Sequence, residues 1–318
     1  MLVFDAALEI ERRARPGGLC HAVDDAGQAQ CRDEIQPVTG VMFGMVAALL
    51  WGGGDFTGGL ATRRSHPLQV LVVSSAAGLA LLAVFALVSR DGLPSQTSAL
   101  WATAAGLSGA LGIAALYRGL ATGRAATVAP VAAVIGAAIP VAVGIGTVGW
   151  PALTQSLGCA VAFPGVWLVS QGTGVADRAH PSGLGFAGVA GFGIGGFLVF
   201  MALVEPGPVF SPLVVARTAT LGASVLVVSV LRLRSLRPER PALACLAGCL
   251  DAGGNVFYLL ATRSARLDVA AVVASMFPAV TVALACWMLS QHVSRVQWLG
   301  VALCTVAVGL LAASDVHL

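Results

Sequence analysis

The segment Gly44–Phe56, with the sequence GMVAALLWGGGDF, has a counterpart 141 residues later in the chain. The counterpart is Gly185–Phe197, GFAGVAGFGIGGF, and several of its glycines fall in matching places. Further on, QSLG beginning at Gln155 meets QWLG beginning at Gln297 after a one-residue insertion. These matches occur in the same order and at nearly one offset. They therefore predict that the chain contains two copies of one unit.

The composition places both units in a membrane. Of the 318 residues 57% are hydrophobic and 10% are charged, against roughly a quarter charged in soluble domains. Apolar runs of about 20 residues, the length that crosses a bilayer, follow one another along most of the chain. We expect ten spans, at 41–62, 67–89, 98–121, 125–147, 152–172, 182–204, 209–231, 241–262, 267–290 and 295–314.

Five spans fall in each unit, the first covering residues 39–173 and the second 181–314. Two copies of a unit with an odd number of spans must enter the membrane in opposite senses. The sequence therefore predicts an all-α integral membrane protein with ten transmembrane helices arranged as two inverted five-helix repeats. Residues 1–38 are polar and mixed in charge, and we expect them to form a disordered tail.

Other classes of partner are disfavoured by charge and cysteine spacing. A net charge of +3, spread along the chain, does not suggest a nucleic-acid surface. Cys245 and Cys249 are spaced i, i+4 but have no His or acidic companions, so we expect no metal site and no cofactor. The expected partners are a small-molecule substrate and the lipid bilayer, in a monomer or a homodimer.

Three charged residues lie deep within the predicted spans. At 1.5 Å per residue, Asp55 lies roughly 21 Å from the beginning of its span, Arg217 roughly 12 Å and Asp251 roughly 15 Å. A charge near the bilayer centre costs at least about 2.5 to 3.5 kcal/mol. Such residues usually face a cavity or pair with one another, so they are candidates for substrate binding or ion coupling. Alternatively, an Asp/Arg pair could only lock two helices together.

The candidate site includes three further side chains. Asn255 and Tyr258 follow Asp251 at spacings of four and seven residues, which places all three on one face of a helix. Trp51 lies one turn before Asp55 and could form a wall of the same cavity. If Asp55 faces an aqueous path, it could bind and release a proton in each transport cycle.

Four glycines, Gly52, Gly54, Gly193 and Gly195, occupy corresponding places in the two copies. Small residues allow helices to approach closely in lipid. Glycines at paired places are also where helices could bend during alternating access. The sequence leaves both interpretations, close packing and hinge, open.

The arrangement of these motifs resembles the drug/metabolite transporter superfamily, in its EamA-type branch. The resemblance rests on Trp-Gly-x-x-x-Phe from Trp51, on YRGLATGRAATVAP from Tyr117 with its echo YLLATRSARLDVAA from Tyr258, on FPAV from Phe277, and on the final span. It implies a ten-helix bundle with cytoplasmic termini, alternating access, and export of metabolites, amino acids or toxic compounds. One departure is that Ala76 stands in the first half at the place of Arg217.

The distribution of arginine conflicts with the orientation that the family implies. Nine Arg residues lie in the odd-numbered loops and four within reach of the other side, which favours external termini. We retain the family's cytoplasmic termini and expect a multi-pass protein of the inner or plasma membrane. The function predicted is secondary active export, without enzymatic activity. The alternatives are an intramembrane lipid-modifying enzyme, although the spans lack His, or a non-transporting sensor or scaffold.

Overall fold

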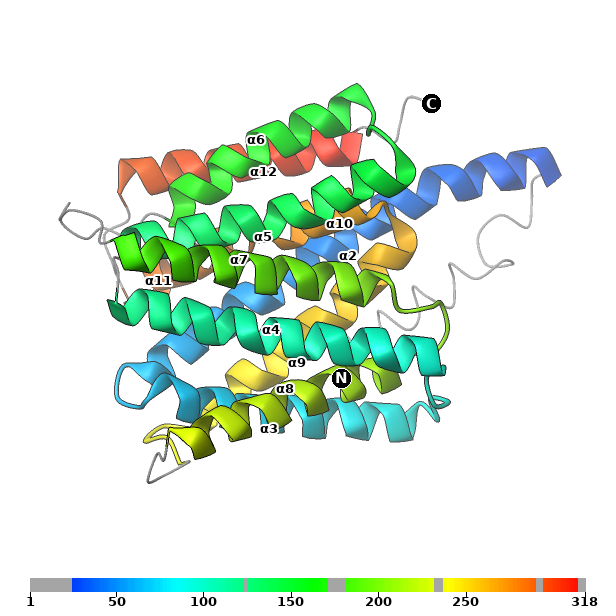
Figure 1. The fold of residues 1–318 in the computed structure, drawn as a ribbon. Coiled ribbons are helices and arrows are strands. Elements are labelled where there is room, and N and C mark those ends of the chain that lie inside the picture. The colour runs from blue at the N-terminus through cyan, green and yellow to red at the C-terminus, as the bar shows by residue number, and fades with distance from the viewer. Residues whose placement is uncertain (1–24, 123–124, 171–180, 232–236, 290–293, 314–318) are drawn as a thin grey trace.

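The computed structural model describes residues 25–122, 125–170, 181–231, 237–289 and 294–313. Within them the chain folds as a bundle of α-helices running across a common thickness (Figure 1). The helices are α2 (Asp25–Thr62), α3 (Pro67–Val88), α4 (Gln96–Thr122), α5 (Ala125–Val148), α6 (Leu153–Ser170), α7 (Pro181–Ala202), α8 (Phe210–Val230), α9 (Pro241–Ser264), α10 (Leu267–Ala274), α11 (Phe277–Leu289) and α12 (Arg295–Ala313).

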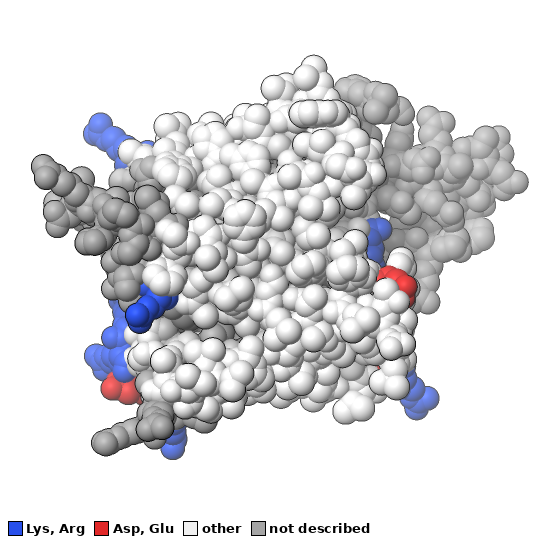
Figure 2. All heavy atoms as spheres, viewed as in Figure 1, with Lys and Arg blue, Asp and Glu red and all other residues white. Residues whose placement is uncertain are grey.

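The ten expected spans correspond to α2 through α9, to α10 together with α11, and to α12. Nine spans in the described residues are long and apolar enough to cross a membrane; α12 has a shorter apolar stretch, Arg295–Leu311. In the view of Figure 2 the charged side chains gather toward the two ends of the bundle and leave a band without charged side chains between them. This distribution fits a bilayer around the middle of the bundle.

The first helix differs from the prediction. It begins at Asp25, inside the segment expected to be a disordered tail, so that expectation is wrong for residues 25–38. Residues 1–24 lie outside the described part of the chain. A helix can continue beyond the hydrocarbon region because its backbone groups bond within the segment whatever surrounds it.

The main packing contacts between helices stay nearly the same when each helix is replaced by its counterpart in the other half. Helix α2 packs most extensively on α9, and its counterpart α7 packs most extensively on α4. The pair α3–α9 is likewise matched by α8–α4, and α6 pairs with α12. In Figure 1, α2 and α7 run in opposite directions across the bundle. These pairings agree with two inverted five-helix repeats; the exact domain boundaries stay predictions.

Close backbone contacts show an offset of 142 residues between the repeats. Gly106 on α4 lies against the carbonyl of Ala216 on α8, and Gly248 on α9 lies against the carbonyl of Ser74 on α3. Adding 142 converts 106 into 248 and 74 into 216. The offset of 141 taken from the sequence is therefore one residue short at these crossings. The match of QSLG from Gln155 with QWLG from Gln297 already has this offset of 142.

One span, which the sequence predicted as continuous, is broken. Helix α10 ends at Ala274, and α11 begins at Phe277. Pro278 has no N–H to donate to the carbonyl of Ala274, four residues earlier, so one hydrogen bond of the helical ladder is missing at this point. The amide of Met276 instead donates to the carbonyl of Val273 at 3.2 Å.

The two faces of the bundle are named here by residues that lie on them. The Gly149 side carries the start of α2, the end of α5 and the start of α10, and the Thr62 side carries the opposite ends. On the Thr62 side His66 caps α3: its Nδ1 accepts from the amide of Leu68 at 3.2 Å, and Gln69 accepts from the His66 amide at 3.2 Å. This reciprocal capping, with Pro67 as first residue, sets the start of α3.

Candidate functional site

The predicted polar face of α9 lies against α2. The Nε1 of Trp51 donates a hydrogen bond to the Oδ1 of Asn255 at 3.2 Å. The Trp51 ring also packs on Tyr258, with 5.5 Å between ring centroids. Gly254 lies directly against the indole, and a side chain there would collide with it. The structure therefore brings together three of the predicted site residues, from helices far apart in the sequence.

Arg217 of α8 forms an ion pair with Asp251 of α9. The Arg217 side chain is buried, with 9% of it exposed, whereas 44% of the Asp251 side chain is exposed. Gly78 on α3 lies beside the Nε of Arg217, and the lack of a side chain there makes room for the guanidinium. The pair therefore links two helices while its carboxylate remains accessible; a part of these charges in substrate binding or ion coupling stays a prediction.

Asp55 is exposed, and its exposed surface does not belong to the outer face of α2. That outer face carries Met42, Met45 and Leu49, which are 56%, 43% and 55% exposed. Asp55 follows Leu49 by six residues and therefore points about 120° away from it. Between the two directions lies Gly52, which is buried against α11. The carboxylate of Asp55 consequently points between α9 and α11, toward the inside of the bundle.

Asp251 has the same relation to its own helix. The outer face of α9 carries Cys245 and Leu246, which are exposed. Asp251 follows Cys245 by six residues, so its side chain also points about 120° away from that face. The two carboxylates are close enough to interact electrostatically. Two accessible acidic groups therefore lie on helix faces turned away from the outer faces of α2 and α9, in the half of the bundle nearer Thr62.

The break between α10 and α11 lies next to this group of side chains. Phe277, the first residue of α11, contacts the edge of Trp51 with ring centroids 6.3 Å apart. The hydroxyl of Thr281 donates to the carbonyl of Gly52 at 3.1 Å and so ties α11 to α2. Phe277 and Thr281 were not among the residues predicted for the site. The FPAV motif from Phe277 was the available signal, but a sequence motif does not indicate which other helix its residues contact.

Tyr258 is fully buried rather than lining an open path. Its hydroxyl donates to the carbonyl of Leu198 on α7 at 2.9 Å, so it connects α9 to α7 within the second repeat. The expectation that Tyr258 is on the accessible polar face therefore does not match this structure. Its ring packs against the Trp51 ring instead.

Tyr258→Phe is expected to lower the free energy of unfolding by about 1 kcal/mol, because it removes one hydrogen bond without changing the packing volume. Thermal unfolding of the detergent-solubilised protein measures the effect. Phe257→Leu serves as a control for changes of ring packing on the same helix. A loss above about 3 kcal/mol in Tyr258→Phe would mean that the hydroxyl has a role beyond this bond.

The four glycines proposed as hinge or packing residues are all in close contact with neighbouring helices. Gly52 lies against Val280 of α11, and Gly54 lies against the backbone of α9 at Ala247. In the second repeat Gly193 meets Gly112, and Gly195 meets Ile139. Both α2 and α7 continue as regular helices through these positions. Close packing accounts for the glycines in this conformation, and the hinge role stays a prediction.

No metal ligands are brought together in the part of the chain that the structure describes: it contains no group of three or more His, Cys, Asp or Glu side chains placed to hold an ion. Cys245 is exposed and Cys249 is partly exposed on the outer half of α9. The site therefore consists of carboxylates, one guanidinium, an amide and aromatic rings. Such a set can bind a polar solute or exchange a proton.

Comparison with known proteins agrees with this architecture. Residues 38–171 match the EamA-like transporter family. A solved structure titled "Crystal structure of protein" is similar over 85% of this chain and 95% of its own, with a TM-score of 0.67 and 17% sequence identity, which shows a shared fold. No curated protein matches. The protein is therefore a multi-pass membrane protein, of which residues 38–171 match the EamA-like transporter family.

Proposed function

We propose that this protein is a secondary active transporter of the cell membrane that exports small polar or amphipathic metabolites, amino acids among them, by alternating access. The observation that carries the proposal is the pair of accessible carboxylates, Asp55 and Asp251, on inward helix faces of an EamA transporter fold. A carboxylate inside a span costs about 2.5 to 3.5 kcal/mol or more unless it is hydrated or paired. An aqueous path for solutes supplies that hydration.

The two carboxylates have different roles in this proposal. Asp251 is held by Arg217, and its remaining exposed surface can accept hydrogen bonds from a solute. Asp55 has no hydrogen bond or ion pair to a described residue that would neutralise it. It is therefore the group that can take up a proton on one side of the membrane and release it on the other.

Flux measurements in proteoliposomes test the proposal. A counterflow screen with amino acids, sugars, nucleosides and cationic drugs first identifies a transported solute. Asp55→Asn is then expected to reduce accumulation driven by a proton gradient at least tenfold while counterflow of the solute continues, because exchange requires no net proton movement. Asp251→Asn is expected to reduce both modes, since it alters the solute-binding surface.

The matched control is Glu239→Gln, which removes a carboxylate from the exposed segment before α9. It is expected to leave both modes of flux unchanged. Wild-type flux in Asp55→Asn and in Asp251→Asn would remove both carboxylates from the mechanism. The absence of saturable flux for every class of solute would instead favour a sensor or scaffold.

A further inference from the structure

We propose that Arg266, Asp268 and the carbonyl of Gly149 form a gate that closes the Gly149 side of the bundle, and that the break at Ser275–Met276 is the hinge about which α10 moves to open it. The proposal rests on the alternating access proposed above, for which it names the moving element. Its test follows the accessibility of one position and requires no transported solute.

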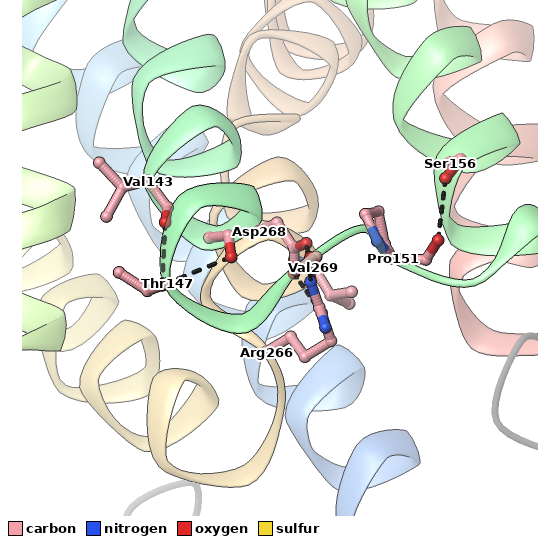
Figure 3. A network of polar contacts seen from close by, with 9 residues as sticks. Val143, Thr147, Pro151, Ser156, Arg266, Asp268 and Val269 are labelled. Atoms are coloured by element: carbon pink, nitrogen blue, oxygen red, sulfur yellow. Dashed lines mark hydrogen bonds and ion pairs between the residues drawn. The ribbon is translucent and has the colours of Figure 1, made fainter.

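The gate joins the two repeats through one arginine. The Nη2 of Arg266 donates to the carbonyl of Gly149, just after α5, at 2.8 Å, and to the Oδ2 of Asp268 at 3.0 Å (Figure 3). The Asp268 side chain is 1% exposed, and its Oδ1 accepts from the amide of Val269 at 2.9 Å. Figure 3 shows these groups between the end of α5 and the start of α10. A buried carboxylate thus fixes the orientation of the guanidinium that reaches across.

The backbone on the α5 side is adapted to this contact. Gly149 has a φ of +90°, a conformation that side-chain-bearing residues rarely adopt. One turn earlier, Gly144 lies against the Cβ and Cγ of Asp268, and a side chain there would push the carboxylate away. Two glycines therefore allow the end of α5 to approach the start of α10.

The fourth span, α5, and the ninth span, α10 with α11, meet on the Gly149 side but not on the Thr62 side. Helix α5 packs against α10, whereas α11 packs against α2 and α6 and makes no comparable contact with α5 in the described residues. In an inverted repeat the fourth and ninth spans are counterparts and should meet equally on both sides if the conformation were symmetric. Between these two spans the structure is therefore closed on the Gly149 side and separated on the Thr62 side, where the amide of Glu239 donates to the hydroxyl of Ser65 at 2.8 Å and joins loops of the two repeats.

Other contacts between the repeats also lie on the Gly149 side. The carboxylate of Asp91 accepts from the amides of Phe210 and Ser211, at 2.7 and 3.1 Å, at the start of α8. Ser95 donates to the carboxylate of Glu205 between α7 and α8. These bonds hold loops together. The Arg266 contact differs because it holds a helix segment of eight residues that is separated from the rest of its span by the break.

The break has the properties of a hinge. Only Ser275 and Met276 lie between α10 and α11, and Pro278 cannot donate the backbone hydrogen bond that would join the two helices at this point. Thr281 anchors α11 to α2 beyond the break, so α10 can rotate without moving α11. Rotation of α10 away from α5 would open a path from the Gly149 side toward Asp55 and Asp251. It requires Arg266 to release the carbonyl of Gly149.

Accessibility of a cysteine at position 55 tests the gate. The variant Asp55→Cys is made in a background without the seven native cysteines, and a small membrane-impermeant thiosulfonate is added from either side of sealed vesicles. With Arg266 present, the thiol is expected to react from the Thr62 side only. Adding Arg266→Ala is expected to raise the modification rate from the Gly149 side at least tenfold and to lower it from the Thr62 side. Loss of hydrogen bonds to a charged group shifts a two-state population by about this factor.

The matched control is Arg263→Ala. Arg263 lies one residue before the end of α9, on the same side of the bundle, but its guanidinium donates to the carbonyls of Gly207 and Pro208 within its own repeat. This variant is expected to leave both modification rates unchanged. If Arg266→Ala does not fold, Arg266→Lys keeps a charge beside Asp268 and is expected to shift the rates by about threefold.

The experiment distinguishes a failure of the gate from a failure of the transport proposal. Modification rates equal to those of the parent in a folded Arg266 variant, or an equal change in Arg263→Ala, would overturn the gate. A shift confined to Arg266 variants supports it even if no solute is found to be transported. Reaction of the parent thiol from the Gly149 side alone would show that the open and closed sides have been assigned wrongly.

Discussion

Gly248→Val is expected to destabilise the protein by about 3 kcal/mol or more, because its side chain would occupy the space of the Ser74 carbonyl where α9 crosses α3. The neighbouring atom is backbone, so it cannot move aside as a flexible side chain would. The two helices must separate, and α9, whose residues 252–261 are all buried, must lose part of its packing. Fluorescence-detected size exclusion and thermal unfolding in detergent measure the loss of folded protein.

Gly222→Val is the matched control for this prediction. Gly222 lies within α8, and a Cβ at this position would meet no atom within 4 Å. The same change of residue is therefore expected to leave the unfolding temperature nearly unchanged. Equal stability of the Gly248 and Gly222 variants would show that the α3–α9 crossing tolerates a wider separation than the structure has.

Asp251→Ala is expected to lower the free energy of unfolding by about 3 kcal/mol, since it leaves the Arg217 guanidinium buried without its counter-charge. Arg217→Met is expected to cost only about 1 kcal/mol, because the Asp251 carboxylate is 44% exposed and can be hydrated. The double variant Arg217→Met/Asp251→Ala is expected to recover most of the loss. Unfolding of the four proteins in one detergent gives the interaction energy as a double-mutant cycle.

The decisive result of this cycle is which of the two single variants loses more free energy of unfolding. A larger loss in Arg217→Met than in Asp251→Ala would contradict the assignment of Arg217 as the buried partner. Failure of the double variant to recover would mean that the pair supports the fold through contacts beyond their mutual attraction.

Most of the fold could be predicted from the sequence, because the length of an apolar run and the residues that interrupt it are local properties. The ten expected spans begin and end within a few residues of the helices, apart from the extension of α2 back to Asp25. The break at Ser275–Met276 is the main internal difference. Pro278 marked the place, but proline inside a span is also compatible with a continuous helix, as Pro164 in α6 shows.

The candidate site was only partly predictable. Acidic residues within apolar spans are conspicuous, so Asp55 and Asp251 could be selected from the sequence. Their different surroundings could not, because burial of Arg217 depends on the space that Gly78 leaves on α3. The enclosure of Tyr258 likewise depends on Leu198, which is 60 residues away.

The sequence by itself determined that this protein is helical, lies in a membrane and consists of two related halves, because hydrophobicity and repetition are recorded in the order of residues. Only the tertiary structure decided which carboxylate is paired, which helix faces are accessible and which side of the bundle is closed. Those properties arise where helices from different repeats meet. A displacement of one residue, such as 142 in place of 141, changes which side chains meet there.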